Sequence, residues 1–251
     1  SYNVWLRLKL LQLAQGQTFK GASGLICLSE YSRNYLIQYH PQLLVQTRVK
    51  LIAHGTENLL DHPVTRDETS TNKKSIRLLY VSTVKKYKHQ WNLIDAVSLL
   101  RKEGISIELH LIGGGDPQAL RWMRESIQRN QSDHEFVFYH GSFPYEKTLE
   151  WYRKVDMFVF PSTCENMPVV LLEAMTFGLP ILSSDRGPMP EVLKDSGLYF
   201  NPESVISIKN CIRFMIENPN LRKRLSAKAK QYSLAYSWEK CANETFSLLR
   251  S

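Results

Sequence analysis

The chain has 251 residues, of which 43% are hydrophobic and 22% charged, a composition typical of a globular protein. No apolar run reaches the roughly 20 residues that a membrane-spanning helix needs, and Arg7, Lys9 and Gln12 interrupt the apolar positions that a signal peptide would require. The formal net charge of +8 indicates an anionic partner, which leaves nucleic acid, a membrane surface or a phosphorylated substrate.

Two strands and two helices are predicted before residue 58. In chain order they are a helix over residues 1–20, a strand over 24–29, a helix after the candidate N-cap Ser29, and a strand over 49–55. The first helix is expected to be amphipathic, with Val4, Leu8 and Leu11 on a common face. The polar stretch over residues 61–75 predicts a linker.

After this stretch, strands and helices alternate over short connections. The predicted strands span 76–82, 106–115, 136–141, 157–162 and 180–185, and the predicted helices span 92–103, 116–129, 146–154 and 168–177. This alternation predicts βαβ units and a parallel sheet, that is, an α/β fold. Parallel sheets of this kind bind ligands beyond the carboxyl ends of their strands, where the Gly113–Gly115 run and two proline-containing turns fall.

The common nucleotide and metal motifs are missing or incomplete. No GxxxxGK phosphate loop occurs, and Gln118 stands where GxGxxG needs its third glycine. Asp-x-Asp does not occur either, so a metal-bridged pyrophosphate has no obvious ligands. A bound pyrophosphate would therefore have to be neutralised by protein groups, and no metal or cofactor is expected.

Glu173 is the unusual residue of the helix predicted over 168–177. Its neighbours in "ENMPVVLLEAM" are apolar, so the helix should be buried, and a buried carboxylate needs a partner. Helical side chains lean toward the N-terminus, so Glu173 should point toward Glu165 and toward the helix tip, which attracts anions. The two alternatives are an exposed helix position for Glu173 and a solvated loop position for Glu165.

These residues resemble the retaining nucleotide-sugar glycosyltransferases of family 4. The resemblance rests on Glu165 and Glu173 with seven residues between them, followed by AMTFGLPILSSDRGPMPEVL, and on the upstream stretches LLYVSTVKKYKHQWNLIDAV, LHLIGGG and FVFYHGSFPYEKTLEWYRKVDMFVFPS. It covers most of the chain. The stretches ENMP and DRGPMPEVL are most similar to those of bacterial enzymes that build surface polysaccharide or O-antigen.

The resemblance implies two facing Rossmann-like domains, the GT-B architecture, with the nucleotide-sugar donor on the second. Glu173 matches the carboxylate that holds the ribose hydroxyls, Glu165 the one that contacts the donor sugar, and Lys88 the lysine that neutralises the leaving pyrophosphate. The remaining expected donor-site residues are Asn166, Met167 and Pro168 of the turn facing sugar and phosphate, Ser142 and Phe143 of the base-reading turn, and Thr83, Gly113 and Gly114 at two strand ends. Retention and metal independence come from the resemblance alone, and UDP and GDP are not distinguished.

The sequence departs from the family's pattern in two places. Ser82 and Thr83 stand where many members have Gly-Arg, so Lys85 or Lys86 is a hypothetical substitute for the lost cation, against the simpler interpretation of a solvated charged turn. The first Rossmann-like domain should also be far longer. Residues 1–58 are therefore expected to be the end of that acceptor-side domain, 59–75 a linker, 76–235 the nucleotide-sugar domain, and 236–251 a helix crossing back.

Several interpretations of function remain open. A retaining glycosyltransferase acting on a glycan or lipid-linked acceptor is the leading one, a non-catalytic nucleotide-sugar-binding module needing a partner chain is the second, and a sugar-nucleotide epimerase is the third.

The basic run over residues 220–232 suits either a solvated helix face, which we favour, or contact with an anionic membrane. No nucleic-acid motif is present. Cys27, Cys164, Cys211 and Cys241 show no metal spacing, which favours reduced thiols in a cytoplasmic protein.

Overall fold

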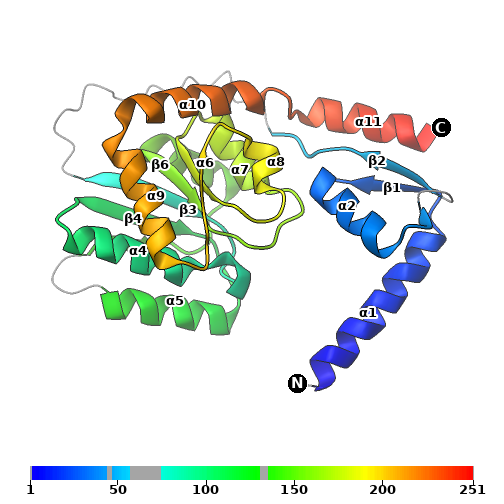
Figure 1. Ribbon diagram of the computed structural model, residues 1–251, viewed down its shortest axis with the longest axis horizontal. Helices are drawn as coiled ribbons and strands as arrows, with labels where there is room; N and C mark the ends of the chain where they lie inside the picture. The colour runs from blue at the N-terminus through cyan, green and yellow to red at the C-terminus, as the bar shows by residue number, and fades with distance from the viewer. Residues whose placement is uncertain (1, 44–46, 57–74, 131–134, 251) are drawn as a thin grey trace.

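A computed structural model of the protein describes residues 2–43, 47–56, 75–130 and 135–250 (Figure 1). Its strands are β1 (Gly24–Cys27), β2 (Arg48–Leu51), β3 (Ile76–Val81), β4 (Ile107–Ile112), β5 (Val137–Tyr139), β6 (Met157–Phe160), β7 (Ile181–Ser184) and β8 (Leu198–Phe200). Its helices are α1 (Tyr2–Lys20), α2 (Glu30–Tyr39), the 3-10 helix η2 (Lys86–Lys88), α4 (Gln90–Lys102), α5 (Pro117–Asn130), α6 (Tyr145–Lys154), α7 (Val169–Thr176), α8 (Met189–Leu193), α9 (Val205–Glu217), α10 (Pro219–Ser233) and α11 (Trp238–Arg250).

Six parallel strands form the central sheet, in the order β5-β4-β3-β6-β7-β8. The chain starts in the middle at β3, runs outward through β4 and β5, and then returns to the other side of β3 to lay down β6, β7 and β8. Leu79 of β3 therefore pairs with His110 of β4 on one side and with Phe158 of β6 on the other. The reversal between β3 and β6 is a topological switch point, the place where open α/β sheets bind ligands in the crevice between diverging loops.

Helices cover both faces of this sheet, which explains why its strands are apolar on both sides. α4 packs on α5 and on α9, and α7 packs on α10. The central strands are buried throughout, and their largest fully enclosed side chains include Tyr80, Phe158 and Phe160. This α/β fold with a parallel sheet confirms the fold class predicted from the sequence.

The remaining elements form a smaller unit beside the sheet. β1 and β2 pair in parallel, α2 packs on both of them, and α11 lies along them, with the side chain of Leu248 close to Gly24 (Figure 1). α1 extends away from this unit, and its side chains of Trp5, Leu10 and Leu13 are exposed. The predicted helix is therefore present, and these apolar side chains are largely exposed.

Observed boundaries differ from the predicted ones by a few residues. α4 begins at Gln90 instead of residue 92, and the strand predicted over 106–115 ends at Ile112, before its glycines. Pro168 is the N-cap of α7 instead of its first helical residue. Most of the predicted linker over 61–75 lies outside the described residues.

Candidate functional site

The ion pair between Lys88 and Glu165 stands at the switch point of the sheet. Lys88 ends η2 in the connection that follows β3, and Glu165 lies in the loop that follows β6. The Lys88 side chain is only 9% exposed and that of Glu165 15% exposed, so both charges are largely withdrawn from water. The hydroxyl of the buried Tyr80 donates to the Lys88 carbonyl over 2.9 Å and fixes the backbone there. Two opposite charges expected at a donor site are thus brought together by strands that pair directly.

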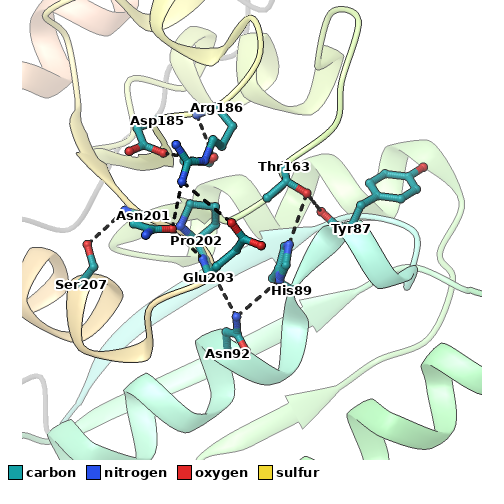
Figure 2. Close-up of polar contacts among 11 residues, drawn as sticks. Tyr87, His89, Asn92, Thr163, Asp185, Arg186, Asn201, Pro202, Glu203 and Ser207 are labelled. Atoms are coloured by element: carbon teal, nitrogen blue, oxygen red, sulfur yellow. Dashed lines mark hydrogen bonds and ion pairs between the residues drawn. The ribbon is translucent and has the colours of Figure 1, made fainter.

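His89 joins the two loops that carry this pair (Figure 2). Its backbone is left-handed, with φ 51°, which is uncommon for a residue other than glycine. Its Nε2 lies 3.2 Å from Oγ1 of Thr163, and its Nδ1 lies 3.4 Å from Nδ2 of Asn92. Thr163 in turn donates through its N–H and its hydroxyl to the carbonyl of Tyr87, over 2.9 and 3.1 Å. Burial lowers the pKa of His89, which favours the neutral ring that this arrangement needs.

The loops after β7 and β8 continue this polar network (Figure 2). Nε of Arg186 lies 3.5 Å from Oδ1 of Asp185, and its Nη2 lies 3.9 Å from Oε2 of Glu203 and 3.5 Å from Oδ1 of Asn201. Asn92 extends the network to β8 by donating to the carbonyl of Pro202 over 2.9 Å. Because two carboxylates flank the Arg186 guanidinium, it is already neutralised within the protein. It connects the loops after β7 and β8, whereas Lys88 is paired with a carboxylate of the loop after β6 and lies over the rings of Tyr87 and Phe160.

Glu173 is buried, with 5% of its surface exposed, as the apolar pattern of α7 predicted. The hydroxyl of Tyr152, on α6, donates to Oε2 of Glu173 over 2.8 Å. Burial first, and then the negative charge of Glu173, raise the pKa of Tyr152 well above its usual value, so the phenol stays protonated as a donor. This partner corrects the sequence argument, which required a ligand to satisfy the carboxylate. The protein meets that need in part itself, and the role of Glu173 toward a ribose stays a proposal.

The carboxyl ends of β3, β4 and β5 meet closely at the glycines. A β-carbon at Gly113 would lie 2.1 Å from the Ser82 carbonyl, and φ at Gly113 is +135°, so only glycine fits. A β-carbon at Gly114 would lie 2.6 Å from Oγ of Ser142, which places Gly114 against the turn that contains Ser142 and Phe143. Contacts of two other residues hold these ends in place. Tyr139 donates to the Gly113 carbonyl over 3.0 Å, and the buried Gln90 donates to the Thr83 carbonyl over 3.2 Å.

The turn before α7 combines exposed and buried residues. Asn166 is exposed, whereas Met167 is 8% exposed and Pro168 is buried. Pro168 has no side chain that could accept from the first N–H groups of α7, so no side chain caps this end of the helix locally. The turn therefore presents a helix N-terminus beside Glu165, a location that favours negative charge.

Sequence reasoning missed Tyr152, His89, Thr163, Gln90 and Arg186 as parts of this site. The family's pattern assigned them nothing, and the contacts of Tyr152, His89 and Thr163 join residues that are 21 to 76 positions apart. One signal was available for His89, because it follows Lys88 directly and precedes a helix.

Among the described residues, no three histidine, cysteine, aspartate or glutamate side chains are arranged to hold a metal ion. No helix among them is long and apolar enough to cross a membrane.

The basic run over residues 220–232 forms α10, and its apolar side is used for packing. Leu225 is 5% exposed and belongs to the core, while Leu221 and Tyr232 pack against that core. Lys228 pairs with Asp195 over 2.5 Å. The helix therefore has no apolar side left to insert into a lipid surface, which favours the solvated interpretation.

The parallel sheet with helices on both faces defines a Rossmann-like α/β protein, and its candidate site lies at the carboxyl ends of the strands. Residues 61–232 match the family described as glycosyl transferases group 1, and the chain belongs to that family. It is 28% identical over 171 residues to the O-antigen chain mannosyltransferase B of Escherichia coli, covering 67% of this chain and 44% of that protein. It is also 28% identical over 224 residues to the amylovoran biosynthesis glycosyltransferase AmsK of Erwinia amylovora, covering 76% of this chain and 52% of that one.

Solved structures share the fold. The sucrose-phosphate synthase of Thermosynechococcus elongatus matches with a TM-score of 0.79 at 22% identity, covering 95% of this chain and 60% of that one. HepE of Anabaena in complex with UDP and glucose matches with a TM-score of 0.76 at 18% identity, covering 92% of this chain and 63% of that one. These matches confirm the expected GT-B architecture. The chain spans about half the length of the curated relatives it matches.

Proposed function

We propose that this chain carries the donor half of a retaining glycosyltransferase that moves a sugar from a UDP- or GDP-linked donor to a glycan or lipid-linked acceptor. The observation that carries the proposal is the Lys88–Glu165 pair at the switch point, with the buried Glu173 on the helix that follows. The names of relatives in O-antigen and amylovoran synthesis support a role in bacterial surface polysaccharide.

In this proposal each group of the crevice has a separate task. Lys88 and the N-terminus of α7 stabilise the negative charge that builds on the diphosphate when the bond to the sugar's anomeric carbon breaks. Glu165 accepts hydrogen bonds from hydroxyls of the donor sugar, and Glu173 accepts from the ribose diol. Ser142 and Phe143 contact the base. Because protein groups supply the positive charge, the reaction needs no metal ion.

The ion pair between Lys88 and Glu165 determines how these two residues would respond to the donor. Without a donor, Lys88 is paired with Glu165. When the diphosphate arrives, its oxygens compete for the Lys88 ammonium, and the released Glu165 carboxylate becomes available to sugar hydroxyls. Donor binding thus exchanges one internal ion pair for two contacts with ligand, so the charge of Lys88 is never left buried alone.

Donor binding is tested by calorimetry with a panel of UDP- and GDP-sugars, in the presence and absence of EDTA. We expect one donor to bind, unchanged by EDTA, and Glu173→Ala to weaken it at least tenfold while near-ultraviolet circular dichroism stays native. The matched control is Glu217→Ala, at an exposed position at the end of α9. Equal affinity of wild type and Glu173→Ala would remove Glu173 from the site.

A non-catalytic nucleotide-sugar-binding module is the second candidate. It is favoured by one observation, that the groups described at the switch point, Lys88, Glu165 and Glu173, are all assigned to the donor. Product analysis during the same incubations separates the two. Transfer to an added glycan, or slow release of free sugar, supports the enzyme, and binding without any turnover supports the module. Conversion of one nucleotide-sugar into its epimer would support neither.

We further propose that the protein acts in the cytoplasm, where its four free cysteines stay reduced. Any contact with an anionic membrane is electrostatic, through exposed cations of α10 such as Arg224 and Lys230, since the apolar side of that helix is packed. Sedimentation with anionic vesicles tests this contact. It should disappear in high salt and weaken in an Arg224→Gln, Lys230→Gln variant.

A further inference from the structure

The N-terminus of α2 is capped by a residue from the opposite part of the chain. The N–H of Glu30 donates to Oε1 of Glu191 over 2.8 Å, and the N–H of Tyr31 donates to Oε2 over 3.0 Å. The first N–H groups of a helix have no partner within it, and they concentrate partial positive charge. A carboxylate that accepts from two of them is held by charge-assisted hydrogen bonds, which are shorter and stronger than neutral ones. We call this contact of Glu191 with Glu30 and Tyr31 the cross-unit cap.

α2 already has a local cap of its own. Ser29 accepts from the N–H of Ser32 over 3.1 Å, and Ser32 accepts from the N–H of Ser29 over 3.2 Å, which together form a capping box. The helix therefore has a sequence-encoded beginning without Glu191. What the cross-unit cap adds is a connection between the β1–α2 unit and the large sheet domain.

Glu191 lies on a short, well-packed helix near the candidate donor site. Its neighbours on α8, Met189, Val192 and Leu193, are 0%, 1% and 0% exposed, so the short helix is anchored in the core. The loop that leads into α8 turns at Gly187, where φ is +57°, and a β-carbon there would lie 3.9 Å from the backbone oxygen of Glu165. The segment that positions Glu191 thus also runs close to the backbone of Glu165.

A second contact between the two units lies near the cap. The N–H of Thr56 donates to the carbonyl of Tyr236 over 3.3 Å, and Oγ1 of Thr56 lies 3.2 Å from Oγ1 of Thr176, on the same helix as Glu173. Tyr236 also interacts with Glu191. Burial first, and then the negative charge of Glu191, raise the pKa of Tyr236. Thr56 therefore reports on the junction of the units, whereas Ser32 reports on α2 alone.

We propose that Glu191 is a positioning residue that fixes the β1–α2 unit against the donor-site loops, so that donor binding and docking of this unit strengthen each other. The inference rests on the proposed donor site. Two features connect the events: the loop at Gly187 runs close to the Glu165 backbone before it leads into α8, and Thr56 contacts Thr176 on the helix that carries Glu173. A ligand that orders Glu165 and its loop favours the geometry that the cap needs, and by linkage the cap favours the ligand by the same factor.

Amide hydrogen exchange of the chain, followed by NMR, tests the cap without relying on activity. In Glu191→Ala we expect exchange at Glu30, Tyr31 and Thr56 to accelerate by about tenfold or more, the ratio that a loss of about 1.4 kcal/mol produces. The matched control is Ser29→Ala, which removes the local cap of the same helix. It should accelerate exchange at Ser32 and leave Thr56 at the wild-type rate. Wild-type exchange at Thr56 in Glu191→Ala would overturn the proposal and reduce Glu191 to a local cap.

Two further measurements complete the test. If Glu191→Ala fails to fold, Glu191→Gln, which keeps one acceptor oxygen, should fold and show intermediate acceleration at Thr56, and its wild-type rate there would equally overturn the proposal. Addition of whichever UDP- or GDP-sugar binds in calorimetry should slow exchange at Tyr31 in wild type and less so in Glu191→Ala. Equal slowing in both would overturn the coupling. If no nucleotide-sugar binds, the proposed function fails, while Thr56 still decides the structural role of Glu191.

Discussion

The hydroxyl of Tyr152 on α6 donates a 2.8 Å hydrogen bond to the carboxylate of Glu173 on α7. Phe177 stacks on the Tyr152 ring at 5.3 Å, so the phenol is held in one orientation by the C-cap residue of the helix that carries its acceptor. This contact explains how the apolar helix α7 tolerates a buried carboxylate. It also gives Glu173 a fixed direction before any ligand is present, which is what a preorganised hydrogen-bond acceptor requires.

Tyr152→Phe should lower the free energy of unfolding by about 1–3 kcal/mol, because a buried carboxylate oxygen loses a hydrogen bond. Donor affinity should fall as well, since Glu173 loses its fixed orientation. Urea unfolding and calorimetry measure the two effects. Tyr232→Phe serves as control, because the Tyr232 hydroxyl donates to the exposed Asp195, and it should cost less than about 1 kcal/mol. Equal losses in the two variants would contradict the structural role assigned to Tyr152.

Lys88→Met should weaken binding of a nucleoside diphosphate by at least about tenfold, because a charge-assisted contact of about 1.5–3 kcal/mol is lost. Lys85→Met and Lys86→Met should each change it less than about twofold, since both side chains are exposed and solvated. Calorimetry with UDP and GDP measures all three. A tenfold loss in Lys85→Met or Lys86→Met would instead identify the substitute for the cation that Ser82 and Thr83 replace.

Thr163→Val removes the hydrogen bonds to His89 and to the Tyr87 carbonyl while keeping the shape of the side chain. We expect a loss of about 0.5–1.5 kcal/mol in stability and a clear loss of donor affinity, because the side-chain contacts that hold the loop of Glu165 to that of Lys88 are lost and only the backbone hydrogen bond of Thr163 remains. Thr245→Val removes a hydrogen bond to the Cys241 carbonyl in α11 and should lower stability alone. Unchanged donor affinity in Thr163→Val would show that the tie is dispensable.

The protein should lose stability as the pH falls from about 6.5 to about 4, through the pair of His110 and His140. Nδ1 of His110 lies 3.1 Å from Nε2 of His140. Burial is the largest cause that lowers the pKa of His110 from 6.5 to about 4, and the positive charges of His140 and Arg77 add to it. The unfolded chain therefore binds protons more readily than the folded one in this range, so stability is fully present above pH 6.5 and is lost below it.

Urea unfolding at pH 7, 6, 5 and 4 measures this loss, which we expect to reach about 2 kcal/mol from His110. Glu108, whose Oε2 lies 3.6 Å from Nε2 of His110, faces the ring and reduces the effect. His110→Phe keeps an aromatic ring between Phe138 and Trp151 and should flatten the profile. An equally steep profile in that variant would assign the loss to other groups.

Much of the large domain followed from local patterns. The apolar runs and the helix signals predicted every strand from β3 to β7 and the helices between them, because periodicity and turn residues act within a few positions of the chain. Glu173 was singled out as a buried acid on the same grounds, and the structure confirms that burial. The roles of Lys88, Glu165 and the donor turns came from the family resemblance and stay predictions.

The sequence by itself determined the α/β alternation, the N-cap Ser29 of α2 and the embedding of one acid in an apolar helix, since all three depend on residues a few positions apart. Tertiary structure alone decided the strand order that creates the crevice, the pairing of Lys88 with Glu165, the phenol that meets Glu173 and the carboxylate of Glu191 on a helix 160 residues away. No local pattern encodes such partners. Each is selected only when packing of the whole chain brings two distant polar groups into the same water-poor space, where leaving either one unpaired is costly.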